Sequence, residues 1–137
     1  MRDGDEVVGR LRVVGVRVER APGRVAAAIS LGYDGGVVVG RADRPAAETQ
    51  IAQVAGEAAL DAIRQVAPGQ TRWVLEQIAV QSLLAGQAVV AHVLLETEGS
   101  PEHLIGSALS RSGPLEDAAA EAVVNAVERR LGWFVKN

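Results

Sequence analysis

The feature that most constrains this chain is that its two halves present the same order of elements. Residues 11–66 contain three extended apolar stretches followed by one alanine-rich helical stretch, and residues 75–131 contain the same series. A shift of about 64 residues aligns the halves, with about two more residues needed at the third strand. It superposes Leu11 on Leu75, Val25 on Val89, Ile29 on Val93 and Ala58 on Ala122. A repeat of this length is one supersecondary unit used twice, which must bury its apolar face against its copy.

Alternation and turn residues predict the elements of each unit. In the first unit we expect strands at 7–20, 24–33 and 37–42, with Val14, Val16 and Val18 on one face, then a helix from Ala46 or Glu48 to Ala67. In the second unit we expect strands at 73–84, 87–96 and 103–110, then a helix from Pro114 that ends at Gly132. Asp34-Gly35-Gly36 indicates a tight hairpin, because these residues tolerate positive φ.

The expected fold class is therefore α+β, with tandem βββα units related by a pseudo-twofold axis, antiparallel sheets and two alanine-rich helices. Residues 1–6 are expected to be disordered. Residues 7–137 should form a single domain built from two repeats, about 7–69 and 70–137. A three-stranded sheet with one helix is marginal alone, so the two units should cover each other.

Composition excludes several classes of function. A net charge of −3 argues against bulk attraction to nucleic acid or to an anionic membrane. The absence of cysteine removes disulfides, thiolate metal sites and cysteine nucleophiles. Apolar runs are shorter than a bilayer span, and the polar, acidic segment Met1–Glu6 does not resemble a signal peptide. We therefore expect a cytoplasmic protein, with no cofactor and no enzymatic activity.

A glycine-bearing third strand leading into a helix of small residues is the most distinctive local pattern. In the second unit, Ile105-Gly106-Ser107-Ala108 precedes the segment 118–127, and 58–63 holds the equivalent place in the first unit. This pattern, over nearly the whole chain, resembles the C-terminal regulatory domain of 2-isopropylmalate synthase. The resemblance implies a stand-alone homologue that forms a homodimer and binds a small metabolite, as that family binds the feedback inhibitor leucine near the junction between units.

The two strand-to-helix junctions are the best candidates for such a ligand. A helix N-terminus offers unpaired N–H groups to an anion, and nearby arginines can clamp a carboxylate or phosphate. The alternative is ordinary helix capping and surface charge. The candidate ligand-binding residues are Arg41, Arg44, Ser107, Arg111 and Ser112.

Other clusters point less clearly to chemistry. His92 and His103 lie on successive strands and could be neighbours, but no third ligand is spaced to join them, so no metal site is expected. Acidic residues at the start of the last helix are more simply a solvated face that suits the helix dipole. Arginines along the first hairpin lack the aromatic partners that RNA binding usually needs, so nucleic acid is an unlikely partner. Trp133 and Phe134 are expected to form an apolar tail that anchors a second subunit.

The preferred interpretation is a non-catalytic, self-associating regulatory module that binds a small carboxylated metabolite such as an amino acid. A protein-interaction or structural module without a small ligand is one alternative, and an RNA-contacting module is another.

Overall fold

A computed structural model describes residues 11–46, 50–67, 69, 71–97, 99–111 and 113–136, with only the backbone described for 129 and 131–136. The segment expected to be disordered, 1–6, and the start of the expected first strand lie outside these residues. Within the described residues, two antiparallel three-stranded sheets and two helices confirm the α+β class and the order βββα in each half. The elements are β1 (Leu11–Ala21), β2 (Arg24–Tyr33), β3 (Gly36–Pro45), α2 (Ile51–Val66), β4 (Arg72–Leu83), β5 (Gly86–Thr97), β6 (Ser100–Ser110) and α3 (Leu115–Lys136).

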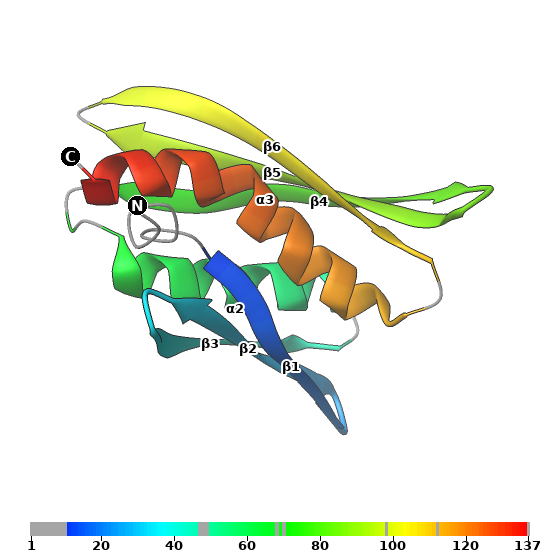
Figure 1. Ribbon diagram of the computed structural model, residues 1–137. Coiled ribbons are helices and arrows are strands. Elements are labelled where there is room, and N and C mark those ends of the chain that lie inside the picture. Colours follow the sequence, from blue (N-terminus) through cyan, green and yellow to red (C-terminus); the bar gives the residue numbers. More distant parts are fainter. Residues whose placement is uncertain are drawn as a thin grey trace.

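The two helices form a layer between the two sheets (Figure 1). Helix α2 packs on β2 and β3 of its own unit, and α3 packs on β5 and β6. The helices also pack against each other, α2 contacts β4, and α3 contacts β1. Each helix therefore touches the first strand of the other unit, so that both units contribute to one shared core.

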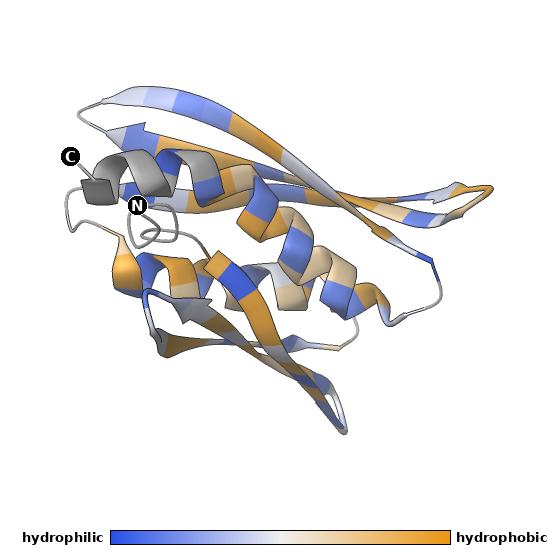
Figure 2. Cartoon of the chain, in the orientation of Figure 1, coloured by the Kyte–Doolittle hydropathy of each residue, from blue (hydrophilic) through white to orange (hydrophobic). Residues whose placement is uncertain are grey.

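The core consists of the inner faces of both sheets and a helical layer of small side chains. Ile29 and Leu31 on β2, Val93 and Leu95 on β5, and Trp73 at the start of β4 are all at most 2% exposed. Alanines supply most of the buried helix positions: Ala52, Ala55, Ala58, Ala59, Ala62, Ala118, Ala119, Ala120, Ala122 and Ala126. Apolar and polar residues alternate along the strands (Figure 2), as sheets with one buried face require.

The first strand of each unit contains a bulge. Pairing of β1 with β2 shifts between Val13 and Gly15, and pairing of β4 with β5 shifts between Leu75 and Gln77. The extra residue reverses the alternation, so that Val14 points outward and is 49% exposed. The expectation that Val14 shares an inner face with Val16 and Val18 is therefore wrong.

The bulges also reveal which positions of the two sheets correspond. Val14 is equivalent to Glu76, and the turn residue Gly23 is equivalent to Ala85. Leu11 consequently corresponds to the buried Trp73, two residues before the Leu75 of the sequence alignment. The helices keep the expected alignment, since Gly40 abuts Ala58 and Ala62 just as Gly106 abuts Ala122 and Ala126.

Glycine is required where the third strand of each sheet meets its helix. A Cβ on Gly40 would lie 2.9 Å from Ala62 Cα and nearer still to the backbone of Ala58. A Cβ on Gly106 would lie 2.7 Å from Ala126 Cα. The helix backbone therefore rests directly on the strand at both places, which only glycine permits.

Most element boundaries agree with the sequence, with four differences, one of which is that β6 begins at Ser100 rather than at His103. The hairpin turn is confirmed at Asp34 (φ 55°) and Gly35 (φ 85°), a pair that suits a type I′ turn. Strand β3 continues to Pro45, and α2 begins at Ile51 rather than at Ala46 or Glu48. Helix α3 passes through Gly132 to Lys136, since an interior glycine costs only about 1 kcal/mol and no proline follows. In the described part of the chain neither helix has the length and apolar character needed to cross a bilayer.

Candidate functional site at the strand–helix junctions

A charged cleft lies where β3, α2 and β4 meet. Its volume is about 270 Å³, and its walls come from both units. We call it the junction cleft, and its charged residues are Arg41, Arg44, Glu57, Asp61 and Arg64. Leu60, Val74 and Leu75 supply its apolar lining. Two of the five residues expected to bind a ligand, Arg41 and Arg44, thus lie here.

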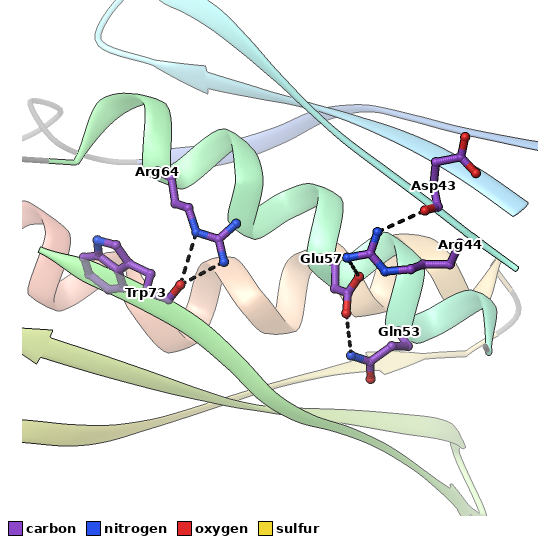
Figure 3. Close-up of polar contacts among 6 residues, drawn as sticks. All are labelled: Asp43, Arg44, Gln53, Glu57, Arg64 and Trp73. Carbon is purple, nitrogen blue, oxygen red and sulfur yellow. Dashed lines mark hydrogen bonds and ion pairs between the residues drawn. The ribbon is translucent and has the colours of Figure 1, made fainter. Parts of the chain in front are cut away.

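Arg44 is held by α2 (Figure 3). Its Nη2 lies 2.7 Å from Glu57 Oε1, and its Nη1 donates a hydrogen bond of 2.9 Å to the carbonyl of Asp43. Gln53 Nε2 donates to Glu57 Oε2 at 3.0 Å. The Arg44–Glu57 contact is an ion pair without hydrogen-bond alignment, which leaves Glu57 Oε1 without a hydrogen-bond donor in the described structure. Arg44 is therefore largely neutralised by its neighbour.

Arg41 and Arg44 point to opposite faces of β3, because they are three residues apart on a strand, and Arg41 on this edge strand lines both the junction cleft and a hollow on the outer face. Its backbone N–H donates to Asp61 Oδ2 at 3.0 Å, and Gln65 Nε2 donates to the carbonyl of Val39 at 2.7 Å. These two side chains of α2 satisfy outward-facing backbone groups of the edge strand β3. Among the described residues the Arg41 guanidinium has no ion-pair partner, so it is available to a ligand.

Arg64 links α2 to the start of the second unit. Its Nε and Nη2 donate to the carbonyl of Trp73 at 3.1 and 2.8 Å (Figure 3). The Trp73 indole N–H in turn donates to Thr71 Oγ1 at 3.0 Å. Arg64, Glu57 and Asp61 are not among the site residues that the sequence predicted. Their spacing on the polar side of α2 was the available indication, since residues three and four apart share a helix face.

The second junction differs in charge. Arg111, Asp117 and Glu121 line a hollow of about 320 Å³ between β6 and α3. Burial raises the pKa of Asp117, and the neighbouring Glu116 carboxylate raises it further. Ser107 does not line this hollow. The structure therefore does not bring Ser107 and Arg111 into one site, and two carboxylates make this junction unfavourable for an anion.

Of the remaining predicted site residues, Ser107 is exposed on β6, and its carbonyl accepts a hydrogen bond of 2.8 Å from Asn125 Nδ2. Ser112 lies outside the described residues. Trp133 and Phe134 belong to the last turns of α3, so the expectation that they follow the helix as a tail is wrong. Their side chains are not described, and an interface role stays a prediction.

The outer face of the first sheet holds a second hollow beside Arg41. Arg17 on β1 and Arg41 on β3 flank Ala28 of β2 in one cross-strand row. Glu19 and Asp43 flank Ala26 in the next row, and these residues line a hollow of about 390 Å³. Asp43 is already paired with Arg24 at 2.8 Å. Positive and negative rows alternate here, so this face presents no continuous basic surface.

The two histidines are neighbours, as their strands suggested. His92 Nε2 and His103 Nδ1 lie 2.7 Å apart on the outer face of the second sheet. Within the described residues, no group of three or more His, Cys, Asp or Glu side chains is close enough to hold a metal ion.

No protein-family model matches this sequence, and no curated protein matches it either. The assignment of a function therefore depends on the geometry above.

Proposed function

We propose that this protein is a non-catalytic, self-associating module of the cytoplasm that binds a small carboxylated metabolite in the junction cleft. The role is that of the regulatory domain of 2-isopropylmalate synthase, which its sequence pattern resembles. The observation that carries the proposal is the cleft itself, because it is charged and its walls come from both units.

The charge of the cleft favours an anion with one negative charge. Three arginines and two carboxylates line the cleft; Glu57 is paired with Arg44, and Asp61 accepts a hydrogen bond from the Arg41 backbone N–H. One positive charge remains uncompensated, on the Arg41 and Arg64 side of the cleft. A guanidinium binds a carboxylate through two parallel hydrogen bonds. The apolar lining from Leu60, Val74 and Leu75 suits the aliphatic part of such a ligand.

Exposed apolar side chains support self-association. Ile105 (61% exposed) and Leu109 (41%) lie on the outer face of the second sheet, and Leu83 and Leu84 stand exposed at the β4–β5 turn. Apolar residues that gather on one face are typical of protein interfaces. A ligand that binds the dimer more tightly than the monomer, or the reverse, shifts the equilibrium between the two. We propose that the module regulates its partner in this way.

A thermal-shift panel of amino acids and short aliphatic monocarboxylates tests the ligand. A ligand at 100 times its Kd stabilises the native state by about 2.7 kcal/mol and must raise Tm. Arg41→Gln should abolish the shift, and Arg20→Gln, an exposed arginine outside the cleft, should preserve it. A flat panel, or a shift retained in Arg41→Gln, refutes binding in the junction cleft.

The alternative is a protein-interaction module without a small ligand, which the exposed apolar face also favours. Molar mass from light scattering separates the two proposals when combined with the panel. A dimer with a flat panel supports the alternative, whereas a monomer with a flat panel rejects both.

A further inference from the structure

The histidine pair occupies a defined place on the second sheet. His103 pairs with Leu94 and His92 pairs with Ile105, so the two histidines are diagonal neighbours on adjacent strands. Both point away from the helices, because Val93, next to His92, is buried and its partner Leu104, next to His103, packs against the core on the inner face. Their ring centroids are 4.9 Å apart. The sheet therefore holds two imidazoles together at the surface without help from any loop.

The contact between the rings is a hydrogen bond that a metal ion can replace. At an N···N distance of 2.7 Å, one nitrogen donates its proton and the other presents its lone pair. When a metal binds, both nitrogens must present lone pairs, so the bridging proton moves to the far nitrogen of its own ring. The exchange needs a change of tautomer and no change in the charge of the pair.

We propose that His92 and His103 chelate a borderline divalent transition-metal ion of the type that imidazole prefers, namely Zn²⁺, Ni²⁺ or Cu²⁺. Imidazole nitrogens bind Zn²⁺ at about 2.0–2.1 Å, so two of them on one ion stand about 2.9 Å apart at a right angle and about 3.4 Å apart at a tetrahedral angle. From 2.7 Å the two nitrogens must move apart by about 0.2 to 0.7 Å, and the rings must tilt about their side-chain torsions so that both lone pairs point at the ion.

The chain supplies two firm ligands, and the remaining positions are open. Gln77 of β4 pairs with His92 on the same face and offers an amide oxygen. Glu96, further along β5, is already paired with Arg72 at 3.4 Å. Water, or the same two histidines of a second copy, fills the other positions. The histidine site shares no residue with the junction cleft, so a test of metal binding is independent of whether the cleft binds a carboxylated ligand.

Calorimetric titration of the untagged protein with NiCl₂ or ZnCl₂ tests the proposal. The chain has only these two histidines and no cysteine, so no other imidazole or thiolate competes. We expect saturable binding of one ion per chain, or of one ion per two chains if copies share it. His92→Gln and His103→Gln should each weaken binding at least about tenfold, because the second ligand of a chelate acts at millimolar effective concentration. Gln81→Ala, on the same face of β4, should leave it unchanged.

Two results overturn the proposal. One is the absence of saturable binding by the wild-type protein up to millimolar metal. The other is undiminished binding by either histidine variant with a native circular dichroism spectrum. Both histidines are at least partly exposed, so these variants should fold.

Discussion

Replacing Gly40 with alanine tests whether the helix rests directly on the sheet. The added Cβ would lie 2.9 Å from Ala62 Cα and closer to the backbone atoms Ala58 O and Ala62 N. Ordinary Cβ contacts lie at 3.4–4 Å, and the obstacle here is helix backbone, which no rotamer change can remove. Helix α2 must therefore move away from β3 as a unit.

The cost of that movement follows from what the contact holds together. Overpacking a well-packed core costs about 1–3 kcal/mol. Retreat of α2 also strains the hydrogen bonds of Asp61 to Arg41 and of Gln65 to Val39, each contributing about 0.5–1.5 kcal/mol. We therefore expect a loss of about 3 kcal/mol in the free energy of unfolding. For a chain of this size that lowers Tm by roughly 10 °C.

Urea unfolding followed by circular dichroism measures the loss. Gly106→Ala should cost a similar amount, and the double variant should lose about 6 kcal/mol, a large part of the 5–15 kcal/mol typical of a domain. Gly113→Ala is the matched control, because a Cβ there meets nothing within 4 Å. If Gly40→Ala unfolds within about 0.5 kcal/mol of the wild type, the proposed packing of α2 on β3 is wrong.

The surroundings of Tyr33, of Trp73 and of the Arg44–Glu57 pair can each be tested by mutation. Burial, and then the Asp34 carboxylate, raise the pKa of Tyr33 above 10.0, so stability should fall as pH rises through the interval between the unfolded and native values. Because the chain has one tyrosine, an ultraviolet titration of the protein reports the ionisation of Tyr33 alone. The variant Asp34→Asn, in which asparagine tolerates the same positive φ, should lower the midpoint of this titration. An unchanged midpoint excludes a contribution of Asp34 to the pKa of Tyr33. Trp73→Ala should destabilise by about 3–5 kcal/mol in urea, against less than about 1 kcal/mol for Val37→Ala at an exposed position. Equal losses would contradict the burial of Trp73. A double-mutant cycle on Arg44→Gln and Glu57→Gln should give a coupling of about 1 kcal/mol or less that shrinks in 1 M salt, and a larger, salt-independent coupling would show that the pair is more deeply buried.

The sequence predicted the order of elements well, because alternation, turn residues and the alanine-rich stretches are local patterns. It could not place the two sheets in their true correspondence. Shifting the alignment of two strands by two residues leaves each side chain on the same face of its sheet. The sequence pattern therefore fits the alignment of Leu11 with Leu75 as well as the alignment of Leu11 with Trp73. The bulges at Val14 and Glu76 show which alignment is correct, and they can be recognised only from the pairing of the strands.

The candidate site was predicted in part. Arg41 and Arg44 were found because arginines beside a helix start suit an anion, but Glu57, Asp61 and Arg64 come from the next helix and reach the cleft only through tertiary packing. The hydrogen-bonded histidine pair was foreseeable from strand order, whereas its 2.7 Å separation depends on the diagonal register of β5 and β6.

The contacts of α2 with β4 and of α3 with β1 limit how the two halves can move relative to each other. If the chain bent between the two halves, α2 would lose its contact with β4 and α3 would lose its contact with β1 at the same time. Hinge-like opening is therefore disfavoured. Binding of a ligand or partner should therefore change the stability or the oligomeric state of the protein, and should leave the relative orientation of its two halves unchanged.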